Sequence, residues 1–283
     1  DKVPESAAVN ESVKLAKKLT RGLSGFVNAI LRSVIREQDS IGIEDLAAND
    51  IEAISFIYNI PLWLINLWIR EFGRDKTEDL CAWFNEQPKL TARINTILID
   101  IPQCLSLLNE QGWDVTQDTN YKDIIYINSH RGSLEKSEAF IKGYITFMDK
   151  ASMLVARLVN PKPGERILDC CAAPGGKSMY MATLMDNVGS LMSCDIHEHK
   201  IELMNSNAER LGASIVHTKV QDATKLPDSW NSYFDRVLVD APCSGLGILQ
   251  KKLDMRWRKQ ESILRELPPL QLAILERAAM TVK

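Results

Sequence analysis

The stretch RILDCCAAPGGK, residues 166–177, decides the fold of this chain. It reads as a short apolar strand, a turn with two glycines and the first residue of a helix. Strands and helices continue to alternate after it, which indicates a parallel, doubly wound sheet. Further strands are expected at residues 190–195, 214–219 and 236–240, with helices at 177–185 and 197–211.

Toward the N-terminus the pattern changes twice. Residues 5–36 carry apolar residues at helical spacing with a break at Gly22 to Gly25, and more helix is expected from 44 to 86. A small α/β part follows, with expected strands at 93–99, 124–127 and within 139–147 and a helix at 105–110. The expected domains are therefore a helical segment at 1–40, a helical linker with a small α/β (RRM-like) domain at 41–148, and the doubly wound domain at 149–283.

Composition excludes several classes of protein. Hydrophobic residues make up 45% of the 283 and charged residues 25%, which is typical of a globular protein. No apolar run reaches the roughly 18 residues that a membrane helix needs. Six cysteines form no CxxC pair, so we expect no metal, and their reduced thiols indicate the cytoplasm. The chain begins without Met and stops at Lys283 inside a helical pattern, so we expect further residues at one or both ends.

The glycine turn and two later aspartates predict the cofactor. The turn matches neither the phosphate loop, whose first glycine would fall on Cys171, nor the dinucleotide pattern G-x-G-x-x-G. Asp195 ends the next strand, where a carboxylate accepts both hydroxyls of a ribose, and Asp222 follows the strand after it, within reach of an adenine edge. These positions favour S-adenosylmethionine (SAM). The simpler alternatives are a tight structural turn and two helix caps.

A second loop, Asp240-Ala241-Pro242-Cys243-Ser244-Gly245, follows the last apolar strand. Enzymes that methylate exocyclic amines place Asn/Asp-Pro-Pro-aromatic here, whereas this chain offers a thiol. Carbon 5 of a pyrimidine becomes nucleophilic only after a thiolate adds to carbon 6. The loop therefore favours a carbon target for the methyl group, and a small buried hydrophobe is the alternative for Cys243.

Two stretches are basic in a chain whose net charge is −3. Residues 1–36 hold seven Lys or Arg against three acids, a net +4, and residues 251–259 place basic residues around Trp257. Such patches suit an RNA backbone and a stacked base, while a solvated helix face is the simpler alternative. The side chains expected to contact RNA are Lys14, Lys17, Lys18, Arg21, Arg32, Lys251, Lys252, Arg256 and Arg258.

Taken together, the motifs resemble the Sun/RsmB (Fmu) family of 16S rRNA cytosine-5 methyltransferases. The resemblance is carried by residues 168–177, by Asp195 and Asp222, and by residues 240–245. Residues 7–11 and 25–32 are similar to the end of a NusB-like RNA-binding domain. The resemblance covers nearly the whole chain. It implies SAM as cofactor and a cytidine of 16S rRNA, or of an early small-subunit assembly intermediate, as target.

The family also implies roles for individual residues. Asp195 would bind the ribose, Asp222 the adenine, and Asp240 would lie beside the methyl donor and the target base. Cys243 would help to release the product, while the attacking cysteine belongs to a Thr-Cys motif that would lie beyond Lys283. Residues 1–283 alone are then expected to bind SAM without turnover. The methionine part of SAM would be cradled by Cys171, Ala172, Ala173, Pro174, Gly175, Gly176 and Lys177.

Three positions depart from the family pattern. Met148 and Lys150 stand where Gln and Glu are usual, and Leu253 stands where Pro is usual. We expect these to alter local packing rather than function. The predicted fold class is thus α/β, a Rossmann-like SAM-dependent methyltransferase domain preceded by a small α/β domain and an all-helical NusB-like segment.

The expected protein is a monomeric SAM-dependent rRNA (cytosine-5) methyltransferase that works through a covalent cysteine adduct, without metal or membrane partner. Two alternatives stay open. In one, Cys243 itself attacks the base, as the Pro-Cys of DNA cytosine methyltransferases does. In the other, the chain is a non-catalytic RNA-binding or ribosome-assembly factor that retains a SAM-binding fold.

Overall fold

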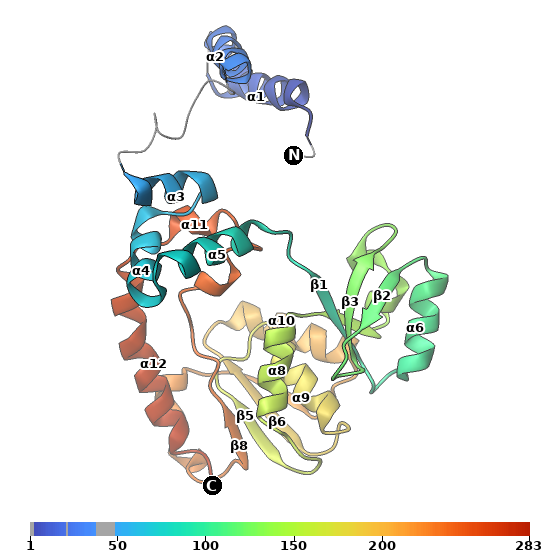
Figure 1. Ribbon diagram of the computed structural model, residues 1–283. Helices are drawn as coiled ribbons and strands as arrows, with labels where there is room; N and C mark the ends of the chain where they lie inside the picture. Colours follow the sequence, from blue (N-terminus) through green and yellow to red (C-terminus); the bar gives the residue numbers. More distant parts are fainter. Residues whose placement is uncertain (1–2, 21, 38–48) are drawn as a thin grey trace. The chain divides into compact units, whose positions relative to one another are not determined.

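The computed structural model describes residues 3–20, 22–37 and 49–283 (Figure 1). Arg21 and the beginning of the helical stretch expected from residue 44 lie outside the described residues. The chain divides into two compact units, Asp1–Glu86 and Gln87–Lys283, and we describe each by itself. The domain boundaries expected after residues 40 and 148 remain predictions.

The first unit is helical throughout its described elements. The helix ends follow local rules: Asn49 caps α3 by accepting from two free backbone N–H groups, and Asn59 closes that helix at φ +51°. Helix α4 begins directly after Pro61, which takes the N-cap position. The two helices expected within residues 5–36 are confirmed as α1 and α2. The elements are α1 (Glu5–Leu19), α2 (Ser24–Glu37), α3 (Asp50–Tyr58), α4 (Leu62–Phe72) and α5 (Arg74–Asn85).

Within the described ranges, no single helix has the length and apolar character to cross a membrane. The bent pair of α3 and α4, whose axes meet at 113°, satisfies those two criteria only when both helices are taken together.

The second unit opens with a four-stranded antiparallel sheet, in the strand order β2-β3-β1-β4. This order and the β-α-β-β-α-β sequence are those of a ferredoxin-like fold. Helices α6 and α7 pack on one face of the sheet, around buried residues such as Ala92, Leu108 and Ile125. The elements are β1 (Leu90–Ile94), α6 (Ile101–Glu110), β2 (Asp114–Gln117), β3 (Ile124–Ser129), α7 (Glu138–Ile141) and β4 (Ile145–Phe147).

The expected helix at 105–110 and strand at 124–127 lie within α6 and β3, but the other expected elements of this part were wrong. The strand expected at 93–99 ends at Ile94, because the Asn95 amide turns inward and donates to the Gly143 and Leu211 carbonyls at 3.0 and 2.8 Å. Only the end of the stretch 139–147 is a strand, since α7 occupies its beginning. Strand β2 was not predicted. Its sequence, Asp-Val-Thr-Gln, is too polar to give a strand signal.

The rest of the unit is a parallel sheet with the strand order β7-β6-β5-β8, which confirms the expected doubly wound fold (Figure 1). The strand order reverses at β5, and ligands bind outside the carboxyl ends of the strands at such a point. The elements are α8 (Lys150–Leu158), β5 (Arg166–Asp169), α9 (Gly176–Leu184), β6 (Ser190–Asp195), α10 (Glu198–Arg210), β7 (Val216–Val220), β8 (Arg236–Leu238), α11 (Met255–Arg258) and α12 (Ile263–Ala279).

A buried polar cluster joins the two sheets. Asp123, just before β3, accepts hydrogen bonds from the Tyr180 hydroxyl at 2.6 Å and from Arg157 on α8. Arg93 of β1 is fully buried and donates to Thr183 of α9 at 3.1 Å. Ile124 of the antiparallel sheet also packs into the main core of the parallel one. The small sheet is therefore held against α8 and α9 by both polar and apolar contacts.

Candidate functional site

The glycine turn is tied to both neighbouring strands of β5. The Cys170 N–H donates to the Leu238 carbonyl at 3.0 Å, and the Ala172 N–H donates to the Cys194 carbonyl at 2.7 Å. The turn closes when the Gly175 N–H reaches the Ala172 carbonyl at 2.7 Å, and α9 begins at the next residue. The backbone between the two strand edges is thereby fixed at the point where the strand order reverses.

Gly175 has to be a glycine for two reasons. Its φ is +94°, a conformation that residues with a side chain rarely adopt. A Cβ at this position would also lie 3.1 Å from the Met179 side chain and 3.3 Å from that of Met204. The paired glycines of the sequence motif thus include one position that the packing of α9 and α10 reserves for glycine.

A cavity of about 140 Å³ opens at the carboxyl ends of β5, β6 and β7. It brings together three of the expected cofactor residues, Cys171, Asp195 and Asp222. The other seven do not line it: Ala172, Ala173, Pro174, Gly175, Gly176, Lys177 and Asp240. The remaining wall comes from Cys170, Ile196, His197, Lys200, Gln221, Ala223, Pro242, Leu270 and Ile274.

One carboxylate oxygen of Asp195 already accepts a hydrogen bond, and the other is free to accept one from a ligand. Its Oδ1 accepts from the backbone N–H of His197 at 3.0 Å and lies 3.6 Å from the Lys200 ammonium. Among the described residues, nothing donates a hydrogen bond to Oδ2. The residue is only 8% exposed, so a ligand in the cavity meets a partly desolvated and oriented carboxylate.

Asp222 caps a short helix at the same time as it lines the cavity. Its Oδ1 accepts from the Thr224 N–H at 2.9 Å and from the Thr224 hydroxyl at 2.7 Å. These hydrogen bonds hold the pKa of the carboxyl below its usual range. Asp222 therefore acts as a helix cap, which was the simpler alternative, and it also lines the cavity.

Asp169, at the end of β5, is a buried carboxylate of the glycine-turn motif for which the sequence predicted no role. Its Oδ2 accepts from the Ser178 hydroxyl at 2.7 Å, while Oδ1 has no hydrogen-bond partner among the described residues. Burial raises the pKa of Asp169 to about 6, against the lowering effect of the Ser178 hydrogen bond. An orphaned buried acceptor next to the turn fits a ligand that carries hydrogen-bond donors or positive charge.

We predict that Asp169→Asn stabilises the ligand-free protein in a pH-dependent way. The folded-state pKa is about 6 and the ordinary value 3.8, so the native state binds more protons and loses stability as pH rises between them. The full penalty, about 3 kcal/mol, is present at pH 8 and falls to about 1 kcal/mol at pH 4.5. Urea unfolding at both pH values measures the gain. An equal gain at the two would contradict the assignment.

The second loop lies beside the turn. Lys177, the first charged residue of α9, pairs with Asp240 at 2.6 Å, so the expected cofactor residue Asp240 faces a lysine of the turn. The Pro242 carbonyl accepts from Gln271 of α12 at 2.8 Å, which fixes the loop, and Cys243 follows with an exposed, free thiol. An exposed thiol is not the small buried hydrophobe that was the alternative for this position.

The expected RNA-contacting residues are mostly at the surface. Lys14, Lys17, Lys18 and Arg32 are exposed on α1 and α2, although Lys14 pairs with Glu11 at 2.6 Å. Lys251, Lys252 and Arg258 are also exposed, with Lys251 paired to Asp149. Arg256 differs from the expectation. It is 2% exposed and its guanidinium donates to the Leu249 carbonyl at 3.3 Å, so it offers no surface charge to a phosphate.

Several residues that line the 140 Å³ cavity were not predicted from the sequence, and a local sequence pattern could have indicated only some of them. Ile196 and His197 directly follow Asp195, and Gln221 precedes Asp222, so their position at strand ends could have indicated them. Leu270 and Ile274 reach the cavity from α12 and belong to no motif. Among the described residues, no group of three or more His, Cys, Asp or Glu side chains is placed to hold a metal ion.

Comparison with known families matches three consecutive parts of the chain. Residues 156–283 match the family described as 16S rRNA methyltransferase RsmB/F. Residues 60–132 match an RsmF/B-like ferredoxin-like domain, and residues 1–36 match the NusB family. The expected family, the Rossmann-like fold and the NusB-like segment are thereby confirmed.

Individual proteins agree with these matches. A probable ribosomal RNA small subunit methyltransferase B from Bacillus subtilis (strain 168) is 36% identical over 285 residues, and its counterpart from Synechocystis sp. is 36% identical over 293. Both alignments include 100% of this chain, but only 63% and 64% of the relatives. The crystal structure of PH0851 matches with a TM-score of 0.86 at 28% identity, over 100% of this chain and 63% of that one.

Proposed function

Since the chain belongs to the family of the 16S rRNA methyltransferases RsmB and RsmF, we propose that it methylates carbon 5 of a cytidine in 16S rRNA, or in an early small-subunit intermediate. The family match supports the part of the proposal that makes the protein a methyltransferase that uses SAM. The cytosine target, the covalent adduct, the monomeric state and the cytoplasmic location are parts of the proposal. The observation that carries it is the convergence of Asp195, Asp222 and the Cys170–Cys171 turn on one cavity.

The residues present fit SAM. Asp195 offers an available oxygen to ribose hydroxyls, and Asp222 lines the neighbouring wall, where an adenine edge would lie. Asp169 does not line the cavity, but it adds a buried carboxylate beside the turn, which suits the positive charge of SAM. SAM supplies an electrophilic methyl group when bound. The chain's own part is to bind and orient it at the edge of the sheet.

The exposed Cys243 loop supports a carbon target. In the proposed reaction, a cysteine thiolate adds to carbon 6 of the cytosine. Carbon 5 then takes the methyl group as its bond to the sulfonium sulfur breaks, which leaves the neutral thioether S-adenosylhomocysteine, and a base accepts the carbon 5 proton. Loss of the carbon 5 proton then breaks the carbon–sulfur bond and frees the product. We assign Cys243 to this release, Asp240 to the side of the target base, and the attack to a cysteine beyond Lys283. The Lys177 ion pair holds Asp240 in position three residues before Cys243.

The test uses the whole translated protein and 16S rRNA labelled with tritium at carbon 5 of cytidine. We expect one tritium released per methyl group incorporated, and only with SAM present. Incorporation without tritium release would place the methyl group on another atom. RNA binding with no methyl transfer would favour the non-catalytic assembly factor.

The role of Cys243 has its own prediction. Cys243→Ala should keep the first methyl transfer within about tenfold but trap the protein on its RNA, because only the release step loses its thiol. Denaturing gels with labelled RNA show the trapped complex, and Ser244→Ala is the matched control that should release normally. If Cys243 were the attacking residue, Cys243→Ala would form no covalent complex, even on RNA that contains 5-fluorocytosine.

A further inference from the structure

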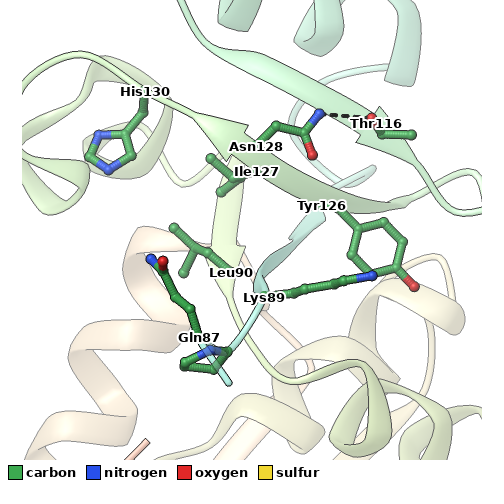
Figure 2. A pocket seen from close by; sticks show the side chains of 9 residues that line it. Gln87, Lys89, Leu90, Thr116, Tyr126, Ile127, Asn128 and His130 are labelled. Atoms are coloured by element: carbon green, nitrogen blue, oxygen red, sulfur yellow. Dashed lines mark hydrogen bonds between the residues drawn. The ribbon is translucent and has the colours of Figure 1, made fainter. Parts of the chain in front are cut away.

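A second cavity, of about 560 Å³, lies on the small antiparallel sheet, away from the glycine turn and both aspartates. Side chains from the start of β1, from β2 and from β3 line it (Figure 2). Its size is within the roughly 300–1,000 Å³ of typical small-molecule sites. The side chains that matter here are Gln87, Lys89, Thr116, Tyr126, Asn128 and His130.

Three of the polar side chains of this cavity stand on the sheet face opposite α6 and α7, while Leu90 and Ile127 of its lining pack against the core on the α6 and α7 side. Thr116 and Tyr126 are directly opposite each other on β2 and β3, and Asn128 lies two residues farther along the same face. The other end of that face is covered, because Thr91 donates to the Met148 carbonyl at 2.7 Å and Arg93 reaches Thr183. Within residues 87–283, the cavity is thus an uncovered part of a face whose remainder is packed.

The lining chemistry differs from that of the cofactor cavity. None of the nine lining residues is acidic, and Lys89 is exposed, whereas Asp195 and Asp222 line the other cavity. The carboxylate that contacts this lining, Asp118, is already paired with Lys150, so an exposed lysine in a lining without acids favours an anionic ligand here, whereas two aspartates favour a cationic one there. The two cavities are therefore suited to different molecules.

The side chains also supply a ring and base-reading groups. Tyr126 is half-buried and its hydroxyl donates to Asp118 at 2.9 Å, so its ring is held in one orientation. Figure 2 shows Lys89 extending toward Tyr126, and the Asn128 amide donates to Thr116 at 2.9 Å. Amide groups read base edges, a ring stacks on a base, and a lysine pairs with a phosphate.

We propose that this cavity binds one unpaired nucleotide of the RNA substrate, with the base against Tyr126 and a phosphate at Lys89. The proposal rests on the proposed function and extends it. It places a substrate contact on the ferredoxin-like sheet, where neither basic stretch of the sequence lies. Single-stranded RNA fits better than a duplex, because only an unstacked base exposes its face to an aromatic ring.

The test measures binding of a fluorescent 16S rRNA fragment to the whole protein by anisotropy. Tyr126→Leu and Tyr126→Phe both remove the hydroxyl group that donates a hydrogen bond to Asp118. Only Tyr126→Leu also removes the aromatic ring. We expect Tyr126→Leu to weaken RNA binding by about 5- to 150-fold and Tyr126→Phe to stay near wild type. Lys89→Ala should lower the slope of log affinity against log salt by about 1, while the exposed control Lys122→Ala should not.

The outcomes separate the two proposals. A wild-type protein that releases tritium while Tyr126→Leu and Lys89→Ala bind RNA as tightly as it does would overturn the nucleotide site alone. A wild-type protein that binds no RNA and transfers no methyl group would overturn the proposed function and the nucleotide site with it. Each variant should bind SAM with wild-type affinity in calorimetry, and a loss there would show that the variant has unfolded the second unit.

Discussion

Asp195→Ala is expected to weaken SAM binding by about 100-fold or more. Its carboxylate is 8% exposed and has one oxygen with no donor among the described residues, so it can accept from two ribose hydroxyls at little cost in reorganisation. Hydrogen bonds to a charged group contribute about 1.5–3 kcal/mol each. Losing two of them removes at least about 3 kcal/mol, which is two orders of magnitude in affinity. Titration calorimetry with SAM measures the loss directly.

Two further variants show whether the carboxylate itself is responsible. Asp195→Asn keeps an acceptor for the His197 N–H, so the turn after β6 stays intact, and we expect an intermediate loss of about tenfold. Asp186→Asn is the matched control, because Asp186 is exposed, precedes β6 at the opposite edge of the sheet, and has a φ of +51° that Asn tolerates. Wild-type affinity in Asp195→Ala would remove the cofactor assignment of this cavity.

The part of this site that was predictable from sequence depends on local geometry. Asp195 and Asp222 were found because the carboxyl ends of parallel strands meet at one edge of the sheet, whatever the rest of the chain does. Leu270 and Ile274 reach the same cavity from α12, about 50 residues or more away from the aspartates in sequence. Nothing local distinguishes them from other apolar helix residues, so no pattern could have placed them there.

The small antiparallel sheet also has some features that the local sequence predicts and others that it does not. Strands with buried β-branched residues, such as β3, were predictable, but β2 was not, since its polar residues form a strand only because β3 pairs with it. Asn95 ends β1 through bonds to residues about 50 and 115 positions later. Arg93 was expected in a strand and lies in β1, but its sequence context did not predict that it is a fully buried cation. Each of these features depends on a partner that is distant in sequence.

Asp123→Ala is expected to destabilise the second unit by about 3–5 kcal/mol, because it leaves the fully buried Arg93 cation and the partly buried Arg157 without their nearby carboxylate. Asp123 accepts from Tyr180 and Arg157, and the Arg93 guanidinium lies 5.2 Å from the centre of the Tyr180 ring. Burial lowers the pKa of Arg93 only to about 10, so it remains charged at pH 7. Its Nε and Nη2 already have no hydrogen-bond partner among the described residues. Urea unfolding near pH 7 measures the change.

An exposed ion pair on α7, a helix that packs on the same sheet, is the control. Glu138→Gln breaks the pair with Lys142, whose side chains are both about half exposed, and should cost less than about 1 kcal/mol. Asp123 joins the small sheet to α8 and α9, whereas the Glu138 pair lies within a single helix and its cap. A cost for Asp123→Ala no greater than that for Glu138→Gln would mean that the other contacts, such as those of Arg93 with Thr183 and of Ile124 with the parallel-sheet core, hold the two sheets together without Asp123. If Asp123→Ala lowers the free energy of unfolding strongly but leaves the SAM affinity of the folded protein unchanged, Asp123 acts in packing the two sheets together and not in the cofactor site.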